Sequence, residues 1–265
     1  MTELINDPHE ITRLADAFQN VAHESGINTT APASDTVDLP GGYVFSNGEL
    51  ATTATVRELN GLDEEAIAKA STTDKAMNVI LERGLVSVGD VSLKLVNLDD
   101  MLVGDRDAIL FGIRQVTFGD TYDLSANCAS CGEANEIVYS IKDHMTMVTL
   151  DNPIEDRVFT VNVKAGEVTL TLPNGLTNKK MLSSSNKSYA ELVTDMLSGC
   201  IVSVNDEPSM GRQTALSLGM SDRDALAKEI ISKAPGPRLS EVSSACKACG
   251  SQVRLALSLA DLFRI

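Results

Sequence analysis

The sequence predicts an α+β fold made of two tandem subdomains that resemble each other and share one zinc ion held by four cysteines. Three observations predict it: short motifs that recur along the chain, two Cys-x-x-Cys-Gly turns, and strand and helix patterns in the same order in both halves. We expect each subdomain to contain β-hairpins, helices and a Cys-x-x-Cys hairpin of the zinc-ribbon kind. The chain has 265 residues and is 43% hydrophobic, which suffices for one or two domains with sizeable cores.

Four short motifs recur in the same order, at offsets of about 115 residues. The matched pairs start at Asn60 and Asn174 (Asn-Gly-Leu), Val86 and Val202 (Val-Ser-Val), Asp105 and Asp222 (Asp-Arg-Asp-Ala), and Cys128 and Cys246 (Cys-x-x-Cys-Gly). A unit of this length is too long for a solenoid repeat and fits two subdomains related by a pseudo-two-fold axis. We therefore expect a first α+β repeat over 37–150 and a second over 151–265, each with one cysteine turn.

Four of the five cysteines lie in two short turns. These turns are Cys128-Ala-Ser-Cys131-Gly132 and Cys246-Lys-Ala-Cys249-Gly250. A glycine at this place can take the positive φ that curls the backbone under a metal, so that both thiolates reach one tetrahedral ion at about 2.3 Å. We expect the four cysteines to bind one structural zinc ion that clamps two distant segments. The fifth, Cys200, is expected to be a small core residue and not a ligand.

Two other interpretations of the cysteine turns use the same residue types. One is a pair of local disulfides, and the other is a redox-active Cys-x-x-Cys. The sequence shows no signal peptide that would indicate an oxidising compartment, and a redox motif is not expected twice in one chain. Both considerations favour zinc.

Before the first repeat, residues 1–24 have the pattern of an amphipathic helix. Its apolar stripe consists of Ile11, Leu14, Ala15, Phe18 and Val21. Residues 25–36 have the composition of a flexible linker, with little to bury. We expect a tethered helix that docks on a partner or folds back onto its own chain.

The first repeat begins with a hairpin and continues through helices. It reads as strands at 43–45 and 52–59, a helix from 62, helical spacing over 76–85, and a helix from 105 to 118. Asn47-Gly48 is a strong hairpin signal between the two strands. Asp105 is predicted to cap the last helix, which Gly119 ends. We interpret the acidic residues of the Asp-Arg-Asp-Ala motif as a cap and a solvated acid, not as catalytic groups.

Each repeat is expected to close in strands that flank its cysteine turn. In the first repeat, Tyr122 and Leu124 lead into the turn, and Ile137, Tyr139 and Ile141 alternate on the way out. The second repeat reads as strands at 158–163 and 168–172 around Ala165-Gly166, a helix containing 192–197, a helix from 221 that ends before Pro235, and a hairpin from 239 to 259. The apolar residues 262–265 should pack against this chain or another.

The charge of the chain argues against polyanionic partners. It has 22 basic and 37 acidic residues, a net charge of −15, which would repel a nucleic-acid backbone and an anionic membrane alike. No apolar run approaches the roughly 20 residues of a membrane span. We expect neither nucleic acid nor membrane as a partner.

Catalytic motifs are not recognisable in the sequence. His9, His23 and His144 are the only histidines, and there is no Gly-x-Ser-x-Gly elbow, phosphate-binding glycine loop or His-Glu-x-x-His helix. A zinc ion held by four thiolates also leaves no position for a water. We expect no enzyme, no catalytic residue and no small-molecule substrate.

One set of motifs resembles a known family. The set comprises Leu39-Pro40-Gly41-Gly42, the acidic helix start at 62–65, the segment 102–114 around Asp-Arg-Asp-Ala, Phe118-Gly119, and the first Cys-x-x-Cys-Gly. In this order and spacing it resembles the baseplate hub proteins of contractile-tailed bacteriophages related to the T-even phages. The resemblance covers about 37–141 and extends weakly to 158–260, but not to the N-terminal helix and linker. The prediction that two cysteine turns share one zinc ion comes from this sequence alone, because the family resemblance involves only one such turn.

This resemblance implies a structural component of the phage tail baseplate that contacts hub, spike, wedge or tube proteins. Such a protein would be found in the host cytoplasm during assembly and in the virion tail baseplate afterwards. Two alternatives stay open. One is a transient assembly factor absent from the finished virion, and the other is a zinc-dependent enzyme or nucleic-acid-binding module.

Overall fold

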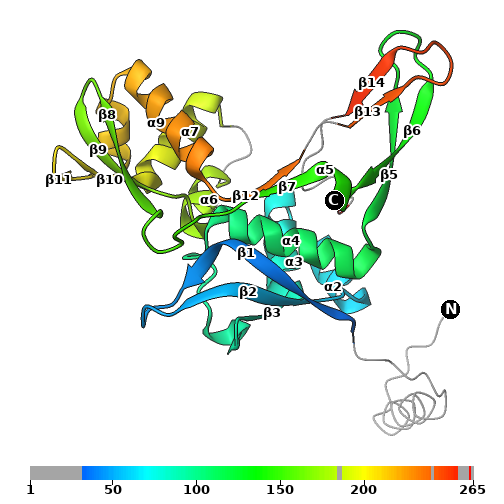
Figure 1. Ribbon diagram of the computed structural model, residues 1–265, viewed down its shortest axis with the longest axis horizontal. Helices are drawn as coiled ribbons and strands as arrows, with labels where there is room; N and C mark the ends of the chain where they lie inside the picture. Colours follow the sequence, from blue (N-terminus) through cyan, green and yellow to red (C-terminus); the bar gives the residue numbers. More distant parts are fainter. Residues whose placement is uncertain (1–31, 184–186, 240–241, 256–262, 264–265) are drawn as a thin grey trace, which may run out of the picture. The chain divides into compact units, whose positions relative to one another are not determined.

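The computed structural model describes residues 32–183, 187–239, 242–255 and 263 (Figure 1). Ala33–Ile265 forms one compact unit, in which we call 33–150 the first half and 151–255 the second half. The expected N-terminal helix over 1–24 and most of the expected linker over 25–36 lie outside the described residues. The described chain mixes helices with antiparallel sheets, in agreement with the α+β class.

The first half is built on a four-stranded antiparallel sheet of order β1-β2-β3-β4. Its strands are β1 Ser34–Val44, β2 Leu50–Arg57, β3 Leu85–Val88 and β4 Val91–Ser92. The turn at Asn47-Gly48 joins β1 to β2, as predicted. Ser34, however, already pairs with Arg57. The chain is therefore in the sheet from Ser34 on, three residues before the expected start of the repeat.

Helices cover this sheet and enclose the first core. They are α2 Gly61–Ala68, α3 Thr73–Gly84, the 3-10 turn η1 Leu93–Leu95, and α4 Val103–Phe118, which lies across β1 and β2 (Figure 1). Fully buried side chains of the core include Ile80, Leu81, Met101, Ile109 and Ile113. Phe263 joins this core, so one residue of the apolar C-terminal segment packs within the chain. Leu85, which the helical spacing included, begins β3 instead.

The second half has a similar order of elements, with a short helix at Arg212–Ser217 where the first half has the 3-10 turn η1. Its sheet has the order β11-β10-β9-β8, with β8 Val158–Val163, β9 Gly166–Thr171, β10 Ile201–Val204 and β11 Glu207–Pro208. Its helices are α6 Gly175–Met181, α7 Tyr189–Cys200, α8 Arg212–Ser217 and α9 Met220–Lys233. A separate core contains Leu170, Leu197, Leu226 and Ile230. Cys200 is fully buried in it, as predicted.

The first aspartate of each Asp-Arg-Asp-Ala motif does not cap its helix, contrary to our prediction for Asp105. The N-caps are Leu102 for α4 and Gly219 for α9, and neither uses a side chain. Asp105 is buried within the first turn of α4 and accepts a hydrogen bond from the Gly41 amide at 2.6 Å. Asp222 accepts from the amides of Lys164 and Ala165 in the β8–β9 turn, at 3.3 and 3.0 Å. Each aspartate therefore ties its helix to the first hairpin of its half.

The arginine of each motif holds the two neighbouring segments in place. Arg106 donates to Asn78 of α3 and to the carbonyl of Leu98 before α4. Arg223 donates in the same way to Thr194 of α7 and to the carbonyl of Ala215 in α8. The Asp-Arg-Asp-Ala motif thus makes corresponding contacts in both halves, and these are tertiary contacts between separate elements.

The two halves contact each other through a pair of antiparallel strands, one from each half. β7 Met145–Val148, the last strand of the first half, pairs antiparallel with β12 Gly236–Leu239, which follows α9 in the second half. Leu239 therefore belongs to β12 and not to the cysteine hairpin in which we placed it. The approach to α4 is so close that a Cβ on Gly104 would lie 1.9 Å from the Pro235 carbonyl oxygen. Only glycine fits there, and this crossing sets the two cysteine hairpins side by side (Figure 1).

A second contact between the halves joins the segment before α4 to the helix α6. The Gly175 amide donates to the carbonyl of Met101 at 2.9 Å, and the Lys179 ammonium pairs with Asp99 at 2.6 Å. Among the described residues, no helix is long and apolar enough to cross a membrane.

Candidate metal centre

Two antiparallel hairpins carry the cysteine turns at their tips. The first consists of β5 Thr121–Asn127 and β6 Ala134–Ser140, and the second of β13 Val242–Ala245 and β14 Gln252–Leu255. The predicted order of strand, turn and strand is therefore present in both halves. Ile141, which we assigned to the outgoing strand, instead begins the short helix α5 Ile141–His144.

The two turns have the same backbone geometry. Gly132 and Gly250 have φ values of 79° and 75°, as the motif predicted, and a side chain would be strained there. Each glycine amide donates to the carbonyl of the first cysteine, at 2.8 Å in the first turn and 2.9 Å in the second. The amide of each first cysteine donates back across the turn, to Glu133 or Ser251, at 2.8 Å. The backbone therefore presents both sulfurs of a turn on one side.

The four sulfurs converge on one point between the hairpins. Cys128 Sγ lies 3.6 Å from Cys249 Sγ, and Cys131 Sγ lies 3.7 Å from Cys246 Sγ. All four ligand atoms lie within 4.8 Å of one another. Ligands at about 2.3 Å from a tetrahedral ion lie about 3.8 Å apart. The site therefore has the size of a four-thiolate metal centre, and each closest pair joins the two halves.

Burial differs within each turn. The first cysteines, Cys128 and Cys246, are only 3% and 4% exposed, whereas Cys131 and Cys249 are exposed. The buried sulfurs lie in an apolar cluster with Phe111 and other side chains. Its further buried members are Tyr122, Ile137, Ile141 and Val253. The hairpins thus bring their own small core, which fixes the inner half of the site.

Backbone amides polarise the sulfurs unequally. The amides of Cys249 and Ala248 lower the pKa of the Cys246 thiol to about 6, and Ser251 lowers the pKa of Cys249. The Glu133 amide also lowers the pKa of Cys131, but the contacts of the Cys131 sulfur with the other three sulfurs outweigh it and raise this pKa to about 12. Four adjacent thiolates repel one another, so the arrangement is suited to a bound cation.

Asn135 is a site residue that the sequence analysis missed. It lies on β6 and is almost fully buried. Its amide nitrogen lies 3.5 Å from Cys246 Sγ, and its oxygen accepts from the Lys247 amide at 2.9 Å. One side chain of the first hairpin therefore braces the turn of the second. In the second half Val253 takes the matching place, four residues after the second cysteine, so no pattern in the sequence signals this contact.

The base of the first hairpin is tied to α4. Asp120 accepts hydrogen bonds from Ser140 Oγ at 2.7 Å, from the Lys142 amide at 3.1 Å and from Gln115 at 3.2 Å. Partial burial alone would raise the pKa of Asp120, but these hydrogen bonds outweigh it and lower the pKa. The hairpin is therefore held at its root as well as at its tip.

In the part of the chain that the structure describes, the four cysteines form the one cluster of metal-ligating side chains that could hold an ion. Cys200 lies apart from it, in the second core, where burial raises the pKa of its thiol to about 12. His144 contacts its own helix start at Ser140. His9 and His23 lie outside the described residues.

The chain matches a known protein family. The family model described as T4 bacteriophage base plate protein matches residues 46–210, which is well over half of the chain. No match was found among curated proteins or among solved structures. The matched range covers β2 to β11 and all of α2 to α7, but it leaves out β1, the end of the second half and the second cysteine turn.

Proposed function

The chain belongs to the T4 bacteriophage base plate protein family, and we propose that it is a zinc-stabilised scaffold in the hub region of the phage tail baseplate. In this role it joins neighbouring baseplate proteins during assembly and stays in the virion tail. The convergence of four cysteine sulfurs from two distant segments carries the proposal, because it provides a rigid metal clamp without an open coordination position.

Zinc is the metal that fits this donor set best. Four thiolates in tetrahedral arrangement select zinc or iron–sulfur chemistry, and twin Cys-x-x-Cys turns on β-hairpins are typical of structural zinc. Such an ion supplies folding energy and no catalysis when all four positions are occupied by sulfur. The role of the metal is therefore to hold the two hairpins together. The same closure argues against a zinc-dependent enzyme.

We also propose that 37–150 and 151–265 are two copies of one α+β unit. The shared order of elements supports this, as do the matching roles of Asp105 and Asp222, and of Arg106 and Arg223. The zinc ion would then lie near the pseudo-two-fold axis that relates the copies. Residues 1–24 and 25–36 remain, in this proposal, an amphipathic arm and its linker.

The test combines metal analysis with detection in virions. Purified protein should contain one zinc per chain, and purified virions should contain the chain in the baseplate. Zinc-loaded protein that is absent from mature virions but present in assembling baseplates would instead indicate a transient assembly factor. Protein that carries no zinc after expression in zinc-supplemented medium would contradict the clamp.

A further inference from the structure

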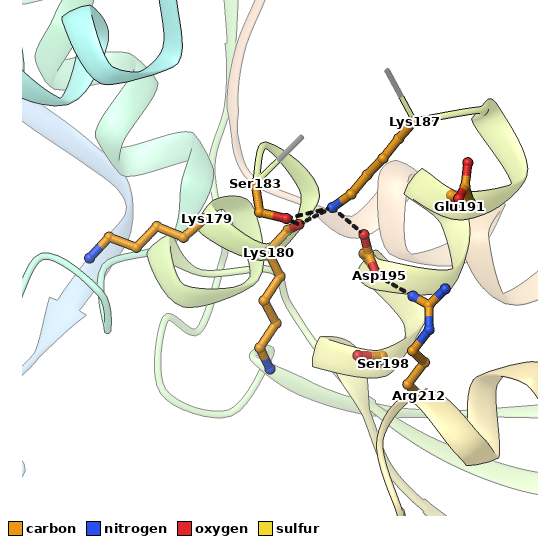
Figure 2. Close-up of a pocket in the computed structure, with 8 residues that line it drawn as sticks. All are labelled: Lys179, Lys180, Ser183, Lys187, Glu191, Asp195, Ser198 and Arg212. Carbon is orange, nitrogen blue, oxygen red and sulfur yellow. Dashed lines mark hydrogen bonds and ion pairs between the residues drawn. The ribbon is translucent and has the colours of Figure 1, made fainter. Parts of the chain in front are cut away.

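A basic pocket lies on the second half, between α6, α7 and α8 (Figure 2). Its volume is about 540 Å³, and four of the eight residues that line it are basic: Lys179, Lys180, Lys187 and Arg212. Two carboxylates, Glu191 and Asp195, also line it. Which of these charges are free determines what the pocket can bind.

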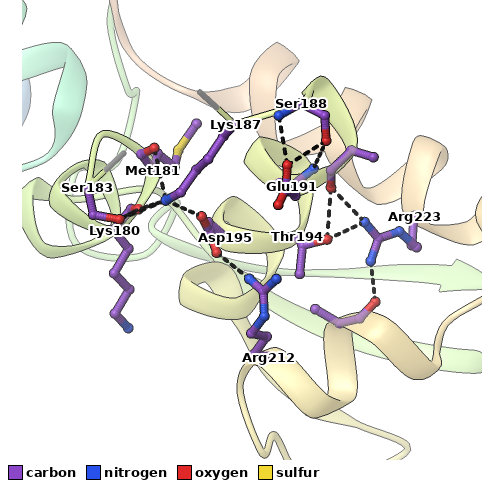
Figure 3. Close-up of polar contacts among 12 residues, drawn as sticks. Lys180, Met181, Ser183, Lys187, Ser188, Glu191, Thr194, Asp195, Arg212 and Arg223 are labelled. Atoms are coloured by element: carbon purple, nitrogen blue, oxygen red, sulfur yellow. Dashed lines mark hydrogen bonds and ion pairs between the residues drawn. The ribbon is translucent and has the colours of Figure 1, made fainter. Parts of the chain in front are cut away.

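The two carboxylates already have partners within the protein (Figure 3). Asp195 lies almost buried between Lys187 and Arg212, with an ammonium nitrogen and a guanidinium nitrogen each at 2.6 Å. Glu191 accepts the amide and the hydroxyl of Ser188 at 2.8 Å, which closes the capping box of α7. The hydrogen bonds of both carboxylates therefore serve the fold, but the partners of Glu191 are uncharged and its carboxylate keeps a negative charge that interacts with Arg212.

Lys187 is also committed to the fold. Besides Asp195, its ammonium donates to Ser183 Oγ at 2.8 Å, to the Met181 carbonyl at 3.2 Å and to the Lys180 carbonyl. It thus neutralises the carbonyl end of α6 and fixes it against α7. Lys179 points away from the pocket in Figure 2 and pairs with Asp99 of the first half.

Lys180 and the donors of Arg212 that Asp195 does not engage remain available to a ligand. Among the described residues, the Lys180 ammonium has no partner. Arg212 uses one guanidinium nitrogen for Asp195, and its side chain is 54% exposed. Figure 2 shows the two approaching the hollow from opposite sides, from α6 and α8, with Ser198 of α7 between them. The pocket therefore offers two cationic groups and a hydroxyl to an anion.

The distribution of charge along the chain makes this pocket accessible to anions. Residues 1–150 contain 9 basic and 24 acidic residues, whereas 151–265 contain 13 of each. All of the net charge of −15 therefore resides in 1–150. Since exposed charges are screened beyond about 8 Å at physiological salt, an anion at the pocket responds mainly to its local surroundings.

The basic character of the pocket is specific to the second half. α2 holds the matching place in the first half and carries Asp63, Glu64 and Glu65. The same three places in α6 are Thr177, Asn178 and Lys179, followed by Lys180. The shared order of elements thus does not require a basic α6.

We propose that Lys180, Ser198 and Arg212 form a docking site for an acidic peptide segment of another protein. The unpaired Lys180 ammonium and the unengaged donors of Arg212 match one or two carboxylates of a short segment. A nucleic acid instead requires many phosphate contacts, typically 6–10, and its length would bring it to the acidic first half. That the partner is a baseplate protein rests on the proposed function.

The test uses the full-length, zinc-loaded chain and fluorescence anisotropy. The probe is a fluorescein-labelled octapeptide of alternating Gly and Glu, and the control peptide has Gln in place of Glu. The variants are Lys180→Gln and Arg212→Gln, with Lys94→Gln as the matched control, since Lys94 is exposed in the first half and has the same charge. Lys180→Gln is the cleaner of the two, because its ammonium makes no contact that the fold needs.

We expect the Glu peptide to bind and the Gln peptide to bind at least tenfold more weakly. Lys180→Gln and Arg212→Gln should each raise the Kd for the Glu peptide by about fivefold or more, and Lys94→Gln should change it less than twofold. Equal affinities of the Lys180→Gln and Lys94→Gln variants would overturn the proposal. So would tighter binding of single-stranded DNA or inorganic phosphate at the same residues, or self-association of the chain that Lys180→Gln abolishes.

The docking site and the proposed function fail separately. Detection of the chain in purified baseplates, without binding of the Glu peptide, would remove the docking site alone. Binding of the Glu peptide by a chain that no baseplate contains would remove the baseplate role alone.

Discussion

In the first half, Asp63 closes a capping box on Asn60 and pairs with Arg57 at 2.8 Å, whereas in the second half Thr177 takes the matching place and α6 begins without a carboxylate. The first aspartate and the arginine of the Asp-Arg-Asp-Ala motif, in contrast, make corresponding contacts in both halves. The carboxylate at the start of α2 belongs to the first half alone, as do the contacts of Asn135 and Gly104. The likeness between the halves is therefore clear at the two motif residues and does not extend to every contact between elements.

The largest expected effect comes from substitutions in the cysteine turns. These substitutions test whether the two halves contribute equally to the metal centre. The double variants Cys128→Ser/Cys131→Ser and Cys246→Ser/Cys249→Ser should both lose the metal, since each removes two of four ligands. Structural zinc contributes roughly 10–16 kcal/mol in small peptides, so the hairpins should open and become sensitive to protease. Elemental analysis and limited proteolysis measure both effects.

Cys200→Ser is the control for these variants, because Cys200 lies in the second core and away from the site. It should keep the zinc content of the wild-type chain. Retention of one zinc per chain by either double variant would show that one turn suffices, and the comparison of equal halves would then be wrong.

A smaller effect on stability is expected from substitutions in the first turns of α4 and α9, where the two helices differ. Gly104 packs against Pro235, and the matching residue of α9 is the exposed Ser221. Gly104→Ala places a methyl group 1.9 Å from a carbonyl oxygen, so it should destabilise the protein by about 3 kcal/mol or more. Ser221→Ala should change the free energy of unfolding by less than about 0.5 kcal/mol. Urea denaturation distinguishes the two, and equal effects would disprove the close crossing.

Asp105, which joins α4 to β1, should make the stability of the protein depend on pH. Burial raises the pKa of its carboxyl to about 7. An unfolded aspartate has a pKa near 3.9, so between about pH 4 and 7 the folded state binds more protons, and stability falls as pH rises through this window. Asp105→Asn keeps an oxygen acceptor for the Gly41 amide and cannot ionise.

We therefore expect Asp105→Asn to stabilise the protein by about 1–3 kcal/mol at pH 8, and to destabilise it at pH 4, where the carboxyl is already neutral and the added amide lacks a partner. Thermal unfolding at both pH values measures the change of sign. An effect of the same sign and size at both would refute a raised pKa. The neighbouring Asp107, whose pKa burial raises to about 6, should leave a weaker pH dependence in the variant.

The smallest effect concerns Asp63, the carboxylate that Thr177 replaces. Partial burial opposes its ionisation, but hydrogen bonds and charge from Arg57 and the Asn60 amide lower its pKa. Its stabilisation is thus present above the unfolded pKa and lost as pH falls through the lower folded value. Asp63→Asn should cost about 1–2 kcal/mol at pH 7 and close to nothing near pH 2. The exposed Glu65→Gln is the control and should cost less than about 0.5 kcal/mol.

Local patterns predicted the hairpins and most helices because turns and helix periods depend on neighbouring residues. The turn at Asn47-Gly48, the β8–β9 turn at Ala165-Gly166 and both cysteine turns are present where the sequence indicated them. The predicted cap at Asp105 was wrong because its carboxylate accepts from the Gly41 amide in the first hairpin instead. A cap and a tertiary contact near a helix start use the same residue type, and only the packing distinguishes them.

The sequence by itself indicated the four candidate ligands, most of the helices, the cysteine hairpins and the expectation that the halves meet at the cysteines. Tertiary structure alone decided how they meet: the pairing of β7 with β12, the crossing at Gly104, the bracing of the second turn by Asn135, and the gathering of Lys180 and Arg212 around one pocket. Local signals arise from the backbone preferences of a few consecutive residues. Contacts between residues about 110 positions apart depend on how two separately folded surfaces fit, and that fit leaves no periodic trace in the sequence.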